Sequence, residues 1–126
     1  MDYWKLNVYI NEAGNDEVDS WLIGLPPDAE AAIRTFFTFL ISQEYLREPF
    51  VKKIKGSEKI FELRHKHNRV QYRPLGCYGP KNKEFTLLIG AIKKEDIWNP
   101  PNAIKSAEKR CKLIHDNIKY VREYDE

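Results

Sequence analysis

Cysteine is scarce in this chain, and its two cysteines follow no recognisable binding pattern. Cys77 and Cys111 lie on unrelated segments, without the CxxC spacing of zinc sites or the cysteine density of a disulfide framework. We therefore predict two reduced thiols, no metal site and no other cofactor.

Long apolar runs are also missing. No stretch approaches the roughly 20 consecutive apolar residues that a transmembrane helix needs, and the first ten residues alternate in polarity instead of forming a secretory leader. The 126 residues are 42% hydrophobic and 13% aromatic, which suffices for one core but not for two. We expect a soluble cytoplasmic protein with no membrane partner and a single domain over residues 1–126.

The net charge of +2 conceals a strong asymmetry. Residues 1–50 carry three Lys or Arg against nine Asp or Glu, whereas residues 51–126 carry eighteen against ten. Basic residues are densest over residues 52–73, where only Glu58 and Glu62 oppose them. Such a field attracts polyanions, and nucleic acid is the commonest of these. A solvated sheet face is the alternative interpretation.

The spacing of apolar residues predicts the order of elements. Residues 4–10 alternate in polarity, as in a half-buried strand. Two helices should follow, the first ending at Pro26-Pro27 and the second capped by Asp28. Residues 50–94 consist of short runs separated by turn residues, which is typical of antiparallel strands.

A final helix, capped by Asn102, should run to Val121, because its apolar residues recur every three or four positions. The sequence thus predicts an α+β fold: an antiparallel sheet, two N-terminal helices and a C-terminal helix, with the helices on one face of the sheet.

The most basic segment predicts a hairpin with one cationic and one apolar side. If His67-Asn68 is a two-residue loop, Lys66 lies opposite Arg69, and the strands extend outward from that pair. Side chains that face each other across two strands share a side of the sheet. One side then carries six polar residues: Glu62, Arg64, Lys66, Arg69, Gln71 and Arg73. The other carries Phe61, Leu63, Val70 and Tyr72, with His65 among them.

Two arginines beside a carboxylate suit metal-independent cleavage of RNA. In that reaction the 2′-hydroxyl attacks the adjacent phosphate, and arginine can bind the phosphoryl oxygens bidentately while staying charged. An ordinary cross-strand ion pair between Glu62 and Arg73 is the alternative. Likewise, Lys93-Lys94 and Trp98 either grip a phosphate and stack on a base, or Trp98 simply packs under the final helix.

Five segments, in this order, resemble the phage-derived branch of the RelE/ParE toxin superfamily, close to HigB-type toxins. That branch typically has a Glu-Leu-Arg strand, a Tyr-Arg strand, an apolar strand ending in Lys-Lys, a proline, and a helix with Ala-x-x-Arg. The corresponding residues here are Ile60–Arg64, Gln71–Arg73, Leu88–Lys94, Pro100/Pro101 and Ala107–Arg110. The resemblance covers roughly residues 50–112.

The resemblance implies a type II toxin–antitoxin system. The chain would be a ribosome-dependent mRNA endonuclease whose partners are the ribosome, mRNA and a cognate antitoxin, often a helix-turn-helix protein. It implies a catalytic group formed by Arg64, Arg73 and Lys94. The residues that would hold the RNA backbone are Lys52, Lys53, Lys55, Lys66, Arg69 and Lys93.

The sequence departs from that branch at two points. Pro74 follows Arg73 where the family strand is usually unbroken, which predicts a kink or an edge at this position. In addition, no C-terminal tyrosine or histidine matches a family general base, although Tyr120 and Tyr124 are available.

Two other functions stay open. A ParE-like inhibitor of DNA gyrase would use the same fold without cleaving RNA, and a phage-derived partner-binding module would keep the fold without activity. The order in which protein and DNA synthesis stop after induction separates the first of these from an RNase.

Overall fold

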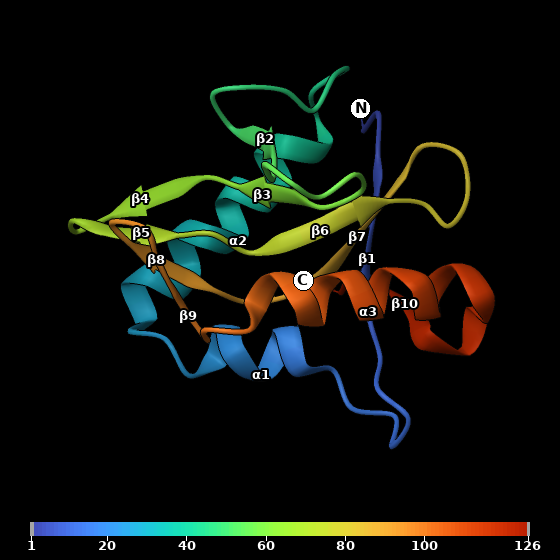
Figure 1. The fold of residues 1–126 in the computed structure, drawn as a ribbon. Helices are drawn as coiled ribbons and strands as arrows, with labels where there is room; N and C mark the ends of the chain where they lie inside the picture. The colour runs from blue at the N-terminus through green and yellow to red at the C-terminus, as the bar shows by residue number, and fades with distance from the viewer. Residues whose placement is uncertain (1, 126) are drawn as a thin grey trace.

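The structure, a computed structural model, describes residues 2–125, which adopt an α+β fold (Figure 1). The helices are α1 (Glu17–Ile23), α2 (Pro27–Ile41) and α3 (Ala103–Asp116), followed by a 3-10 turn, η1 (Ile118–Tyr120). The strands are β1 (Lys5–Tyr9), β2 (Val51–Lys53), β3 (Phe61–Leu63), β4 (His65–His67), β5 (Val70–Tyr72), β6 (Leu75–Tyr78), β7 (Glu84–Ile89), β8 (Ile92–Lys94), β9 (Ile97–Asn99) and β10 (Val121–Glu123). No helix within residues 2–125 is long and apolar enough to cross a membrane.

The strands form two sheets. The six-stranded sheet has the order β10-β1-β7-β6-β3-β2, and the four-stranded sheet has the order β4-β5-β8-β9. Most neighbouring strands are antiparallel, as predicted, but β1 and β7 are parallel. Both faces of β1 are covered, since Leu6, Asn7, Val8 and Tyr9 are all buried. The prediction of a half-buried first strand was therefore wrong, because one core covers Leu6 and Val8 and a second core on the other face covers Tyr9.

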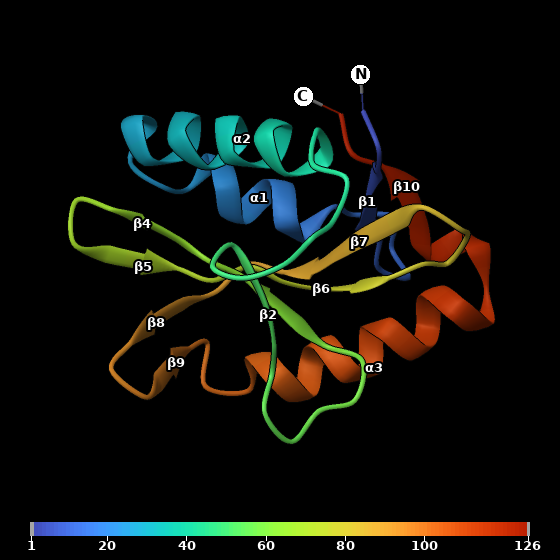
Figure 2. The same cartoon turned by 90° about the horizontal axis from the view of Figure 1, so that it is seen from above.

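Helices cover both faces of the six-stranded sheet, not one face as predicted (Figure 2). Helices α1 and α2 pack over one core, and α3 packs over a second core on the opposite face. Consecutive residues of β7 show the division, since Leu87 belongs to the first core and Leu88 to the second. A strand that is apolar on both sides needs a cover on each, which explains why α3 does not join the other helices.

The C-terminal helix is shorter than predicted. It ends at Asp116, where Asn117 turns to an extended conformation with φ −152° and its side chain accepts a hydrogen bond from the Lys119 amide at 2.9 Å. After η1 the chain forms β10, which pairs antiparallel with β1. Val121, expected to face a helical core, lies instead in a strand, as β-branched residues often do.

The hairpin β4–β5 turns at Asn68-Arg69 and not at His67-Asn68. Both turn residues have positive φ, 48° and 68°, as a type I′ turn requires, and asparagine accepts such a conformation more readily than histidine. Lys66 therefore pairs with Gln71 instead of Arg69. This pairing differs from the predicted one by two residues, and a shift of two leaves each paired side chain on its predicted face.

The two arginines of the hairpin segment lie where the chain passes from one sheet to the other. Arg64 separates β3 from β4, and Arg73-Pro74 separates β5 from β6. Pro74 has no amide hydrogen, but its carbonyl oxygen accepts a hydrogen bond from the Leu63 amide at 2.9 Å. The strand is therefore interrupted at Arg73-Pro74 and resumes in the other sheet, at the position where Pro74 predicted a kink or an edge.

Candidate functional site: a cationic face on the smaller sheet

A row of four side chains crosses the four-stranded sheet. Lys66 pairs with Gln71, Gln71 with Lys93, and Lys93 with Trp98. Directly paired residues share a face, so these side chains lie next to one another. The Nζ atom of Lys93 is 5.2 Å from the centroid of the Trp98 ring, which is a cation–π contact.

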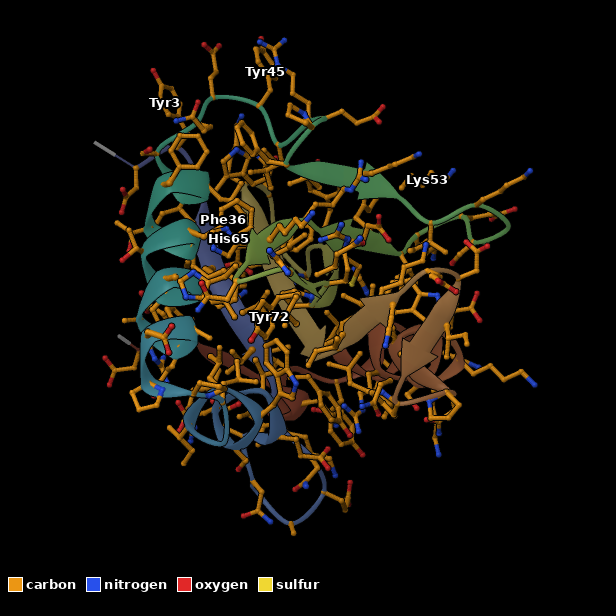
Figure 3. The ribbon with its side chains drawn as sticks, turned by 90° about the vertical axis from the view of Figure 1, so that its left-hand side faces the viewer. Tyr3, Phe36, Tyr45, Lys53, His65 and Tyr72 are labelled. Atoms are coloured by element: carbon orange, nitrogen blue, oxygen red, sulfur yellow. The ribbon has the colours of Figure 1, made fainter. Side chains whose placement is uncertain are left out.

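The other face of this sheet is packed against helices. His65 stacks on Phe36 of α2 with ring centroids 4.9 Å apart, and Tyr72 meets Trp21 of α1 edge-on at 6.3 Å. Figure 3 shows Phe36 and His65 side by side, with Tyr72 further along the same side. The row from Lys66 to Trp98 therefore lies on the face that α1 and α2 leave uncovered.

Arg73 continues the row toward the larger sheet. Its Nη2 donates to Gln71 Oε1 at 2.9 Å, and its Nη1 donates to the Tyr72 carbonyl oxygen at 3.1 Å. Its side chain is only 8% exposed. Burial lowers the pKa of Arg73, and the charge of Arg64 adds to this while Glu62 opposes it; an arginine stays protonated at neutral pH all the same. Arg73 is a buried cation whose orientation is fixed by its neighbours.

Glu62 links the two arginines. Its Oε1 lies 3.4 Å from Arg64 Nε and 3.9 Å from Arg73 Nε. The Arg64 side chain is 35% exposed, and its Nε makes no hydrogen bond to any residue that the structure describes. Arg64 is thus the arginine of this pair that a ligand can reach. Lys52, paired with Glu62 across β2 and β3, adds a further positive charge.

We call this group of side chains the cationic face. Its members are Lys52, Glu62, Arg64, Lys66, Gln71, Arg73, Lys93 and Trp98.

Comparison with known proteins assigns the family. The sequence model of the family described as Phage derived protein Gp49-like (DUF891) matches residues 20–112, well over half of the chain. The chain belongs to the Gp49-like family. The Gp49-like proteins are a RelE-like toxin family, and the matched segment contains the whole cationic face. No curated protein and no solved structure matches this Gp49-like chain.

Four of the predicted site residues lie away from the cationic face of this Gp49-like protein. Lys94 pairs with Ile97 and projects from the opposite side of β8 to Lys93. Lys53 pairs with Phe61 and projects from the opposite side of β2 to Lys52; Figure 3 shows it at the edge of the molecule. The other two lie in connections, Lys55 between β2 and β3 and Arg69 in the turn of the hairpin.

Sequence reasoning gave no role to Gln71 of the Gp49-like chain. In the structure Gln71 stands between Lys66 and Lys93 and accepts the hydrogen bond that orients Arg73. A signal was present, because residues i and i+2 of a strand point to the same side, which places Gln71 next to Arg73.

The three histidines of this Gp49-like protein all lie elsewhere. His65 is stacked on Phe36, where burial lowers its pKa and its Nε2 makes no hydrogen bond within residues 2–125. His67 Nε2 is 2.9 Å from an oxygen of Asp28, and His115 lies on α3. Within the described residues, no imidazole is available on the cationic face for general acid or base catalysis.

Asp28 does not cap α2 as predicted. Helix α2 begins at Pro27, with Pro26 at the N-cap position and no side-chain hydrogen bond there. The Asp28 carboxylate instead accepts hydrogen bonds from His67 and Asn68, and the first of these lowers its pKa. Asp28 thus ties the start of α2 to the tip of the β4–β5 hairpin.

Proposed function

We propose that this Gp49-like protein is the toxin of a type II toxin–antitoxin system and cleaves mRNA on the ribosome, using the cationic face as its RNA site. The observation that carries this proposal is the grouping of Arg64, Arg73, Lys66 and Lys93 on the sheet face that α1 and α2 leave uncovered, next to Trp98, which is half-buried against the second core. RNA offers both partners that such a surface requires, a phosphate backbone for the cations and bases for the aromatic ring. Membership of a RelE-like toxin family supports the toxin class.

The proposed reaction is the attack of a ribose 2′-hydroxyl on the adjacent phosphate, which yields a cyclic phosphate and a free 5′-hydroxyl. Negative charge builds up on the phosphoryl oxygens in the transition state. A fixed guanidinium group stabilises that charge without reorganising. Arg64, the accessible arginine, binds these oxygens, and Lys66 and Lys93 hold the flanking phosphates.

Arg73 is a positioning residue in this proposal. Its guanidinium is occupied by Gln71 and the Tyr72 carbonyl oxygen, and its side chain is largely buried. It holds Gln71 between the two lysines, and through Glu62 it helps to place Arg64. Its positive charge also adds to the field that the phosphate meets.

Trp98 supplies the contact that a purely electrostatic surface lacks. Stacking of one base on an aromatic side chain contributes about 1–3 kcal/mol. The Nζ of Lys93 already lies over this ring at 5.2 Å, so one nucleotide could have its base on Trp98 and its phosphate at Lys93.

The same surface suits neutralisation by a cognate antitoxin, for which we propose an acidic segment and a helix-turn-helix domain. An acidic segment laid across the cationic face would pair with Lys66, Lys93 and Arg64 and would exclude RNA. The ribosome is the second proposed partner, as the source of positioned mRNA.

One observation favours a second candidate function, a ParE-like inhibitor of DNA gyrase that binds its target without cleaving RNA. The carboxylate of Glu62 lies between two arginines, and no histidine in the described chain reaches this face. The cationic face therefore offers no evident general base. A protein that only binds its target does not need one.

Mapping of cleavage sites in bacteria without antitoxin distinguishes the two. We would induce the wild type, Arg64→Ala, and Lys94→Ala as the matched control from the opposite side of β8, and map new 5′ ends on a reporter mRNA with and without its start codon. Cleavage of the translated message by the wild type and Lys94→Ala, but not by Arg64→Ala, is the expected result. Growth arrest with intact mRNA would overturn the RNase proposal in favour of gyrase inhibition.

A further inference from the structure

Three metal-binding side chains meet on the second core, away from the cationic face. They are Cys77 on β6 and Cys111 and His115 on α3, and their ligand atoms all lie within 4.8 Å of one another. The Sγ of Cys111 is 3.8 Å from Nδ1 of His115. Residues four apart on a helix share a side, and alternate residues of β6 face α3, so secondary structure alone brings the three groups together.

The spacing of these atoms suits a tetrahedral metal ion. With zinc–sulfur and zinc–nitrogen bonds of about 2.3 Å and 2.0 Å, a sulfur and a nitrogen ligand of the same ion stand roughly 3.6 Å apart. The separation of 3.8 Å between Cys111 Sγ and His115 Nδ1 is close to that value. The two thiols are unbridged and buried.

The imidazole of His115 is held in place by its surroundings. Its Nδ1 also lies 2.8 Å from the Cys111 carbonyl oxygen; a proton shared by these two atoms in the metal-free protein has to leave before Nδ1 binds a metal ion. Gly79 provides the space beside the ring, since a Cβ atom there would lie 2.5 Å from His115 Nε2. The chain therefore accommodates an imidazole against the two sulfurs.

A cavity of about 530 Å³ leads from the surface to this cluster, and Cys111 and His115 form part of its wall. Acidic side chains outnumber basic ones around it: Glu58, Glu108 and Asp116 against Lys59 and Lys112. The cavity gives a cation a route to Cys111 and His115, with Cys77 behind them, and leaves room for water as a fourth ligand.

We propose that Cys77, Cys111 and His115 bind one Zn²⁺ ion. Two thiolates and an imidazole are the ligands that this borderline-soft cation prefers. The ion would fasten the last turn of α3 to β6, just before the chain turns back into β10. The proposal concerns the stability of the fold and does not depend on the RNase proposal.

Zinc binding by the purified wild-type protein tests the proposal directly. Reduced, metal-free protein would be titrated with Zn²⁺ against a chromophoric chelator, and Co²⁺ would be used to detect thiolate-to-metal charge-transfer absorption. We expect one ion per chain and a higher thermal unfolding midpoint with zinc, because a ligand that binds only the folded state stabilises it.

Substitutions then identify the ligands. Cys111→Ala should weaken zinc binding by about 100-fold or more, and the exposed His115→Ala by at least about 10-fold. His67→Ala, a histidine outside the cluster, is the matched control and should bind zinc as the wild type does. Zinc should also protect Cys77 and Cys111 of the wild type from alkylation.

Three results would overturn the proposal: no stoichiometric binding by the wild type at micromolar zinc, equal binding by a variant that lacks all three residues, or a Cys77–Cys111 disulfide that forms in air whether or not zinc is present. Because the first and third results concern the wild type alone, a variant that fails to fold cannot obscure them.

Discussion

The two sheets of this protein differ in what covers them. The six-stranded sheet is packed under α1 and α2 on one face and under α3 on the other. The four-stranded sheet packs one face against α1 and α2, whereas α3 packs on β6 and β7 of the larger sheet, and Trp98 of β9 reaches the core beneath α3. The face turned away from α1 and α2 carries the row from Lys66 to Trp98. The larger sheet thus contributes to two cores, whereas the smaller one contributes mainly to the first and carries the surface for which we propose RNA binding.

Substitutions in the two cores should lower the free energy of unfolding far more than substitutions on the cationic face. Leu87→Ala in the first core and Leu88→Ala in the second should each lower the free energy of unfolding by about 2–5 kcal/mol, because each leaves a cavity in a fully buried site. Lys93→Ala on the cationic face should change it by less than about 0.5 kcal/mol. Urea denaturation of the three variants measures these values, and a Lys93→Ala protein as unstable as Leu88→Ala would break the contrast.

Substitution of Arg73 and of Arg64 should have different effects on stability, because Arg73 is buried and Arg64 is more exposed. Arg73→Ala leaves the buried Glu62 without this partner and should destabilise the fold by about 3–5 kcal/mol. Arg64→Ala removes a more exposed ion pair and should cost about 1 kcal/mol or less, yet abolish growth inhibition.

A double substitution separates the loss of charge pairing from the loss of packing. Replacing Glu62 and Arg73 together by leucine should be less destabilising than Arg73→Ala alone, because the buried carboxylate is removed with its buried partner and only the more exposed Arg64 loses an ion pair. If Arg64→Ala destabilised the protein more than Arg73→Ala, the assignment of Arg73 as the positioning residue would be wrong.

Substitution of Trp98 should lower the affinity for single-stranded RNA by a smaller amount. Trp98→Ala should weaken binding by about 1–3 kcal/mol, and Trp98→Phe by less, because phenylalanine retains a stacking surface. Fluorescence anisotropy with a labelled oligonucleotide measures both. Equal affinities for wild type and Trp98→Ala would show that Trp98 only packs under α3.

The pH dependence of stability should be the smallest effect. Burial against Phe36 lowers the pKa of His65 in the folded state, so the unfolded chain takes up the proton more readily. The resulting stability is present above the unfolded pKa of about 6.5 and is lost as the pH falls through the lower folded pKa. His65→Phe, which keeps the stacking contact, should lose less stability than the wild type between pH 7 and pH 5.

Urea midpoints at pH 7 and pH 5 measure this difference. An equal loss in both proteins would show that another group is responsible.

Much of the cationic face could be predicted because of the strand period. The observed pairing of Lys66 with Gln71 differs from the predicted one by two residues, so alternation still placed Arg64, Gln71 and Arg73 on one side. Alternation could not decide between Lys93 and Lys94, however. That choice depends on the pairing of β8 with β5, in which Lys93 lies opposite Gln71.

The features that escaped prediction depend on contacts between distant segments. Residues near β1 and β10 are more than a hundred positions apart, and nothing local to Val121 indicates that this residue pairs with Tyr9. Cys77 and Cys111 likewise show no metal-site spacing, because one ligand comes from a strand and the others from a helix. Composition correctly indicated two free thiols but not that they lie together.

Paired charge reversals at two adjacent residues test the central claim most directly. Lys93→Glu and Lys94→Glu alter the net charge equally and differ only in the side of β8 on which they project. Growth inhibition and cleavage of translated mRNA should be lost in Lys93→Glu and retained in Lys94→Glu. Loss of both activities in Lys94→Glu with retention in Lys93→Glu would contradict the assignment of the functional face.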